Sequence, residues 1–165
     1  MPEVFYTSEE VAQIVKGTIE DRAEWFWRLY SAFKKSDPKG AREIAERVIH
    51  EFGVRKVGKM NLPKSATARE FVEAVDSGPA KLAFDMKAIK LEDDESSVLF
   101  FACPFMGVFA KLGLADEEKR ELCEIANCGD FGMISCFPEL ELDFPELLSK
   151  GGRCCHMHVA KKKQN

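Results

Sequence analysis

The chain has 165 residues, of which 45% are hydrophobic and 32% charged, and its formal net charge is −4. A chain of this length and composition can bury a core of its own and does not have the makeup of a disordered protein, so a single domain over 1–165 is expected. The acidic balance argues against a general nucleic-acid binder, which needs a basic surface.

No targeting or membrane-spanning segment is recognisable in the sequence. Residues 1–10 lack the basic start and the apolar run of a secretory signal. No window approaches the roughly 18 consecutive apolar residues that span a bilayer. We therefore expect a cytoplasmic protein without a membrane partner. Because thiols stay reduced in that compartment, the six cysteines should act as buried thiols, metal ligands or reactive groups rather than as disulfides.

The first half of the sequence has the spacing of helices. A Thr-x-x-Glu capping box at residues 7–10 precedes apolar residues that recur at helical intervals, which predicts a helix over about 8–35. Asp37–Pro38 then stops the chain and starts a second helix, which we expect to end at Gly53. With a loop and a short third helix after it, this half forms a helical scaffold over about 8–76.

The second half contains the strands and the cysteines, over about 80–160. From Lys81 apolar and polar residues alternate, which predicts a half-buried strand, and 96–103 is expected to return beside it as a central strand with two apolar faces. The segment 131–148 is expected to be irregular or a short strand, and 153–160 to be the closing strand. The predicted fold class is therefore α+β, with an N-terminal helical layer packed on an antiparallel sheet of about three strands.

Two helices are expected between the strands. Pro104 ends the second strand and begins a short helix that Gly113 terminates. Asp116 is expected to cap a further helix, with Cys128 at its C-terminal end and Gly129 as the exit residue.

Chemically reactive side chains are concentrated in the last third of the sequence. All six cysteines and two of the three histidines lie between Cys103 and His158. Alternation along the last strand places Cys155, Met157 and Val159 on one face, which has the composition of a core face. Its other face carries Cys154, His156 and His158, and therefore offers metal ligands or solvent-exposed groups.

Three of the thiols are expected to come from separate elements that meet. Cys103 ends the central strand, Cys128 ends a helix and Cys155 lies in the last strand, so pairing of the two strands would bring them together. Three thiolates and a fourth donor suit zinc or another transition metal, whereas an iron–sulfur cluster would need cysteine donors throughout. The candidates for the fourth donor are Asp130, Cys123 and His156. The alternative is that the thiols pack as small apolar groups, which we favour for Cys136 and Cys154.

The same residues resemble a known family. Cys103–Pro104–Phe105 follows a strand, Cys128–Gly129–Asp130 follows a helix, and Gly151–Gly152 precedes the strand that carries Cys155. Over roughly residues 20–160 this pattern resembles the family of L-2-amino-thiazoline-4-carboxylate hydrolase and its many prokaryotic relatives. The sequence departs from the family pattern in having Gly152 in place of Asp and Met157 in place of Phe.

The resemblance implies a hydrolase acting on a small ring compound with an amidine-type C=N or C–N bond. Such ring opening needs an activated water, which a general base or a thiolate-held metal supplies. In this interpretation Asp130 is the base, Cys103 is a nucleophile or ligand, and His156 is an acid or orienting group. The metal ligands would be Cys103, Cys128, Cys155 and Cys123.

Two other functions agree with the same residues. Small-molecule-sensing domains of the V4R type also end with a cysteine-bearing strand after a glycine turn, so a non-catalytic domain that binds a metal or a small molecule is the main alternative. The third possibility is a helical interaction module in which the thiols are inert.

Overall fold

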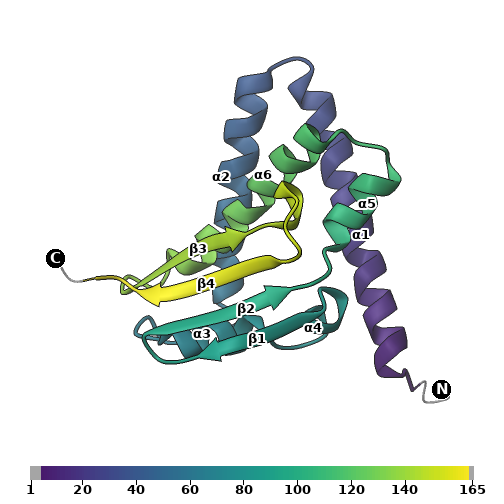
Figure 1. Ribbon diagram of the computed structural model, residues 1–165. Coiled ribbons are helices and arrows are strands. Elements are labelled where there is room, and N and C mark those ends of the chain that lie inside the picture. Colours follow the sequence, from purple (N-terminus) through teal and green to yellow (C-terminus); the bar gives the residue numbers. More distant parts are fainter. Residues whose placement is uncertain (1–4, 164–165) are drawn as a thin grey trace.

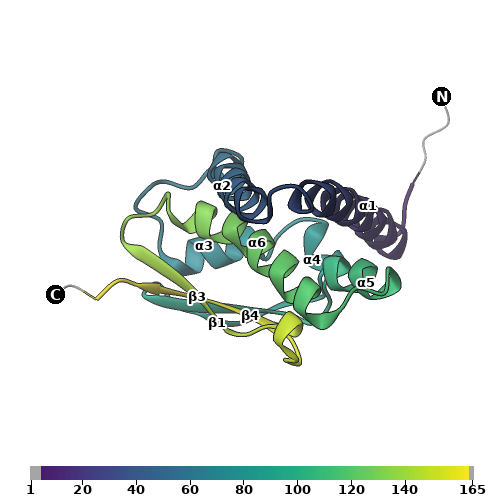
Figure 2. The same ribbon diagram turned by 90° about the horizontal axis from the view of Figure 1, so that it is seen from above.

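The computed structural model describes residues 5–163 and confirms the α+β class, with all its helices on one face of a four-stranded antiparallel sheet (Figures 1 and 2). Figure 2 shows α1 and α2 as the layer farthest from the sheet, with α3 and α6 between them and the strands. The helices are α1 (Ser8–Lys34), α2 (Pro38–Val57), α3 (Ala68–Val75), α4 (Ala80–Ala83), α5 (Pro104–Lys111) and α6 (Asp116–Ile134). The strands are β1 (Met86–Leu91), β2 (Glu95–Phe100), β3 (Leu140–Glu146) and β4 (Cys155–Lys161), and a short 3-10 turn, η1 (Leu148–Lys150), joins β3 to β4.

Side-chain caps fix where the N-terminal helices begin. At the start of α1 the Thr7 hydroxyl accepts the Glu10 backbone N–H, and the Glu10 carboxylate accepts the Thr7 backbone N–H at 2.7 Å, which confirms the predicted capping box. Asp37 caps α2 by accepting the Gly40 N–H at 2.9 Å. Thr67 caps α3 with a capping box of its own.

The sheet has the order β1-β2-β4-β3, so β2 is central, as its two apolar faces predicted. β2 pairs with β4 in a register that sets Phe100 opposite Cys155. The predicted pairing of the central and closing strands is therefore confirmed. β3 pairs with β4 and makes the sheet four-stranded, where about three strands were predicted. It lies in the segment 131–148, which was expected to be either irregular or a short strand.

The predictions that the second helix ends at Gly53 and that the helix after Asp116 ends at Cys128–Gly129 are both wrong. α2 continues through Gly53 to Val57, and α6 continues through Cys128 and Gly129 to Ile134. These glycines lie where α2 and α6 pack against each other: a Cβ at Gly53 would lie 1.9 Å from the Gly129 carbonyl oxygen, and a Cβ at Gly132 would lie 2.1 Å from the His50 carbonyl oxygen. Gly53 and Gly132 are therefore needed for close helix contact rather than for chain termination.

Three further boundaries differ from the sequence prediction. The stretch after Lys81 forms the last turns of α4, and β1 begins only at Met86, after Asp85 takes a positive φ of 48°. β2 ends at Phe100, so Cys103 is not the last strand residue but the N-cap of α5. The N-cap of α6 is Ala115, which makes no side-chain cap, and the acidic residues that start at Asp116 occupy the first helical turn.

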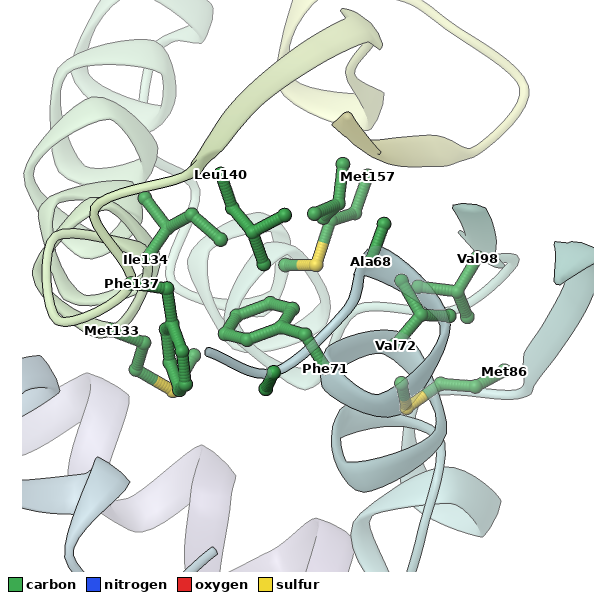
Figure 3. Packing of buried hydrophobic residues seen from close by; sticks show 12 residues of the cluster. Ala68, Phe71, Val72, Met86, Val98, Met133, Ile134, Phe137, Leu140 and Met157 are labelled. Carbon is green, nitrogen blue, oxygen red and sulfur yellow. The ribbon is translucent and has the colours of Figure 1, made fainter. Parts of the chain in front are cut away.

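Two apolar clusters hold the layers together. The first lies between the sheet, α3 and the C-terminal part of α6, where the Phe71 and Phe137 rings meet edge to face at 5.4 Å and Met157 packs from β4 (Figure 3). The second joins α1, α2, α5 and α6 around Phe109, Leu122 and Ile125, all fully buried. Among residues 5–163, no helix combines the length and apolar character needed to cross a membrane.

Candidate functional site

The candidate site lies at the end of the sheet where β2 leaves and β4 begins. Cys103 is held at this point because Pro104 starts α5 immediately after it, and Cys155 is the first residue of β4, paired with Phe100. The predicted approach of these two cysteines therefore follows from the β2–β4 register. Both thiols are partly buried.

The Cys103 thiol is surrounded mainly by protein rather than water. Burial raises the pKa of this thiol to about 11, although the backbone amides of Met106 and Phe105, at the start of α5, act in the opposite direction. The ionised forms of Cys123 and Asp130 would raise this pKa further, so both groups are within electrostatic range of Cys103. At neutral pH Cys103 is therefore a neutral thiol.

Cys155 is in a similar state. Burial raises the pKa of its thiol to about 12, while the Leu148 backbone N–H, which donates to Sγ at 3.4 Å, lowers it. The ionised forms of Cys103 and Cys123 would add to the rise, so the three thiols are within electrostatic range of one another. A group of neutral thiols acts as a set of weak donors and polarisable contacts, and becomes nucleophilic only when a base removes a proton.

α6 contributes the other two members of the site. Cys123 and Asp130 are separated by two helical turns and therefore lie on the same face of α6. Burial raises the pKa of Asp130 to about 6, and the positive charge of Lys56 partly offsets this rise. A carboxylate with a pKa just below neutrality is largely ionised at pH 7 and can still hold a proton, which is the property of a general base.

The structure places two expected site residues elsewhere. Cys128 lies toward α2, where its Sγ donates to the Glu124 carbonyl at 3.5 Å, and its strongest charged influences are Glu46 and Arg42. His156 projects from β4 to the face opposite Cys155, where its Nε2 lies 3.0 Å from the Ser97 hydroxyl. Asp130 also raises the pKa of Cys128, but less than burial and Glu46 do. We call the set of Cys103, Cys123, Cys155 and Asp130 the thiol–Asp130 cluster.

His158 shares the outward face of β4 with His156, as the alternation predicted. Its ring centroid lies 6.3 Å from that of His156. The His158 Nδ1 is 2.6 Å from Asp143 Oδ1 on β3, and its Nε2 is 3.0 Å from Glu95 Oε1 on β2. Both ring nitrogens are thus engaged with carboxylates, and the residue links three strands instead of presenting a free imidazole.

Cys136 and Cys154 make structural contacts. The Cys136 Sγ donates to the Gly132 carbonyl at 3.7 Å, and the buried Cys154 thiol lies 3.6 Å from Glu146 Oε2. Glu146 also accepts the Arg153 backbone N–H at 2.5 Å. Beside it Gly152 has no room for a side chain, since a Cβ there would lie 2.5 Å from Glu146 Cγ, and this accounts for glycine at that turn.

The described residues do not form a metal centre of three or more donors. Within residues 5–163 there is no group of three or more His, Cys, Asp or Glu side chains placed to hold a metal ion. The expected set of Cys103, Cys123, Cys128 and Cys155 is divided, because Cys128 faces α2. Zinc or another transition metal therefore stays a prediction from residue type.

Two residues near the site were not expected from the sequence. The Ser149 hydroxyl, in η1, lies beside Cys123 and lowers the pKa of its thiol against the larger, opposite effect of burial. Lys56, the cation that acts on Asp130, was assigned to a loop because α2 was expected to end at Gly53. Placing Lys56 would have required recognising the glycine as a helix contact.

Comparison with known proteins assigns the chain to a family. The family model for L-2-amino-thiazoline-4-carboxylic acid hydrolase matches residues 12–159. The chain belongs to this family. The match covers the whole thiol–Asp130 cluster and confirms the resemblance seen in the sequence. No curated protein matches the chain.

The fold is also that of a solved structure from another family. The chain is similar to a trafficking protein particle complex subunit 3 from Naegleria fowleri, solved covalently bound to palmitic acid, with a TM-score of 0.60 and 15% sequence identity. The alignment covers 90% of this chain and 97% of the other. At this identity the similarity establishes only that the two proteins share a fold.

Proposed function

We propose that this protein hydrolyses the ring of a 2-amino-thiazoline-4-carboxylate or a close cyclic amidine, with Asp130 as general base. Family membership over 12–159 supports the reaction class. The observation that carries the assignment of the base is the environment of Asp130, a buried carboxylate with a raised pKa whose charge acts on the Cys103 and Cys123 thiols. A strongly perturbed acid beside a group of potential nucleophiles is typical of functional sites.

The proposed reaction needs only water and one proton carrier. Asp130 takes a proton from water as the oxygen adds to the amidine carbon of the ring. The resulting tetrahedral adduct collapses by breaking one ring bond to that carbon, and the proton held by Asp130 passes to the departing sulfur or nitrogen. One water is consumed, and Asp130 returns to its ionised form. A pKa of about 6 suits both halves of this cycle near neutral pH.

The neutral thiols of Cys103 and Cys155 would line the site. With pKa values raised to about 11 and 12, they do not compete with Asp130 as bases at neutral pH and they add no negative charge beside an anionic substrate. A route through a Cys103 thioether-type adduct would require Asp130 to deprotonate Cys103 first. Separate replacement of Asp130 and Cys103 distinguishes attack by water from attack by the Cys103 sulfur.

The test is incubation of purified protein with L-2-amino-thiazoline-4-carboxylate, followed by detection of the ring-opened product by mass spectrometry. We expect turnover by the wild type and by Cys128→Ser, whose thiol faces α2, and loss of at least 100-fold in Asp130→Asn, the range expected for removal of a general base. Cys103→Ser retains activity if water is the nucleophile. Absence of turnover by the wild type refutes the proposal.

The Asp130→Asn variant should lose activity without losing its fold. A carboxyl whose pKa rises from 3.8 to about 6 on folding destabilises the folded protein once it is ionised in both states. The neutral amide removes this cost, so Asp130→Asn should be more stable at pH 7 by about 1–3 kcal/mol, and the gain should vanish below pH 4. Chemical denaturation at the two pH values measures it.

A second candidate function is covalent binding of an acyl group by Cys103. The observations that favour it are the shared fold with a subunit that carries palmitic acid covalently, and a buried, neutral Cys103 thiol. In the required step the Cys103 sulfur displaces the thiol of an acyl thioester such as palmitoyl-coenzyme A, and the proton goes to the released thiol. Intact-mass analysis after mixing should then show one acyl group on wild type and none on Cys103→Ser. Unmodified wild type rejects this candidate.

A further inference from the structure

α1 and α2 bury little of their surface within the chain. Of the 27 residues of α1 only Ile19, Ala23 and Tyr30 are buried, and of the 20 residues of α2 only Ala41 and Gly53. Long helices in water owe most of their stability to packing of an apolar face. α1 and α2 therefore bury less apolar surface within the chain than helices of their length usually do.

Each of these helices also carries an exposed row of large apolar side chains. On α1 the row is Trp25, Leu29 and Phe33, with exposed fractions of 68%, 56% and 44%; on α2 it is Ile44, Val48 and Phe52, with 45%, 45% and 39%. Spacing of four residues places each set on one side of its helix. We call these the outer rows. They belong to the layer that lies farthest from the sheet (Figure 2).

The outer rows form two parts of one surface. α1 and α2 run antiparallel from their shared turn and diverge from it (Figure 1). Both helices contribute residues to the second apolar cluster and cover it on the side away from the sheet. On α2 the outer row lies beside the row of Ala41, Ala45 and Ile49 that joins this cluster. The surface therefore continues an existing core outward.

The size of this surface fits an interface between proteins. Six side chains of this kind, each close to half exposed, present about 500 Å² of apolar area, near the upper end for the largest patch on a monomer. With a polar rim it approaches the roughly 800 Å² that each partner contributes to a stable complex. Trp25, the most exposed member of the rows, is of a residue type that commonly anchors such interfaces.

The charges around the outer rows favour a partner of the same kind. Arg28 pairs with Glu24, Arg47 with Glu51, and Lys39 with Glu43, each within its own helix. The rim therefore has both signs in close alternation and no field that selects a strongly acidic or basic partner. Two copies of a two-helix surface of this type associate about a two-fold axis as a four-helix bundle, in which each row meets its counterpart.

We propose that the outer rows of α1 and α2 form the interface of a homodimer. This surface lies on the side of α6 opposite the strands, whereas the thiol–Asp130 cluster lies at the sheet end, so a dimer formed here would not cover the cluster. The inference does not depend on the proposed hydrolysis. It can fail while activity is present, and activity can fail while the dimer forms.

The test is the mass of the intact protein by sedimentation equilibrium between about 1 and 100 µM. We expect twice the mass of one chain for the wild type, and the mass of a single chain for Leu29→Glu and Val48→Glu. Glutamate has a helix propensity close to that of leucine, so folding should persist and circular dichroism should be unchanged. The matched control is Ile89→Glu, at a 52% exposed apolar residue of β1, which should remain a dimer.

Dilution supplies a second readout. Trp25 should shift its fluorescence maximum to longer wavelength as the dimer dissociates, whereas Trp27, whose Nε1 donates to Glu118 at 2.9 Å, should not contribute. Trp25→Phe should therefore abolish the shift, with Trp27→Phe as its control. Wild type with the mass of one chain at 100 µM, or a Leu29→Glu/Val48→Glu double variant that retains the mass of two, overturns the proposal.

Discussion

The crossing of α2 and α6 provides a quantitative test of how the site is positioned. A Cβ at Gly53 would lie 1.9 Å from the Gly129 carbonyl oxygen, and one at Gly132 would lie 2.1 Å from the His50 carbonyl oxygen. Both obstacles are backbone atoms of the facing helix, which no side-chain rotation can relieve. An ordinary contact needs more than 3 Å, so alanine at either position must force the helices apart by about 1 Å.

The expected cost follows from two opposing effects. Overpacking of a well-packed contact costs about 1–3 kcal/mol, and replacing a helical glycine by alanine returns up to about 1 kcal/mol. Gly53→Ala and Gly132→Ala should therefore lower the free energy of unfolding, by up to about 2 kcal/mol. Gly129→Ala is the matched control, because its Cβ would meet only Ile49 Cγ2 at 3.5 Å, an ordinary contact. It should be neutral or stabilising by up to about 1 kcal/mol.

Urea denaturation of the three variants measures these differences. The same displacement of α6 should move Asp130 and Cys123 relative to Cys103, so Gly132→Ala should also lose activity, whereas Gly129→Ala should not. If Gly53→Ala and Gly132→Ala are as stable as Gly129→Ala, the two helices are not in the close contact described, and the positioning argument fails.

Two further predictions concern the histidine link and the metal. Burial lowers the pKa of His158, but its hydrogen bonds to Asp143 and Glu95 outweigh this effect and raise the pKa above 6.5. The stabilisation that the imidazolium provides is therefore complete below pH 6.5 and is lost as pH rises through the raised pKa. The difference in melting temperature between wild type and His158→Gln should shrink from pH 6 to pH 9, and a difference independent of pH would contradict the link. Elemental analysis of anaerobically purified protein tests the metal prediction made from residue type. Zinc that is lost in Cys103→Ser and kept in Cys136→Ser would support it, and a metal-free protein in which all six thiols titrate would refute it.

Local sequence signals predicted the scaffold well where the chain makes its own contacts. The Thr7–Glu10 capping box and the two apolar faces of β2 both depend on neighbours in sequence, and both are confirmed. The α+β class follows from the change in period between the two halves. The fourth strand was less visible because β3 contains Pro145, which is tolerated in an edge strand.

The errors occur where a contact between distant segments decides the outcome. Gly53 and Gly129 have the sequence context of helix ends, but both lie inside helices, and the close packing of α2 on α6 accounts for glycine at position 53. That one error moved Lys56 into a loop and Cys128 to a helix end. As a result Cys128 was expected in the site together with Cys123, whereas only Cys123, two turns before Asp130, is on the same face of α6 as that carboxylate.

The pH dependence of ring opening tests the central claim, that Asp130 is the general base of a hydrolase. With L-2-amino-thiazoline-4-carboxylate as substrate, kcat/KM of the wild type should rise with pH through a single ionisation near 6 and then level off. Asp130→Asn should remain folded and show a rate at least 100-fold lower without that ionisation, while Cys128→Ser should follow the wild type. A wild-type rate that shows no ionisation near 6, or an Asp130→Asn variant that retains the wild-type profile, would contradict the claim.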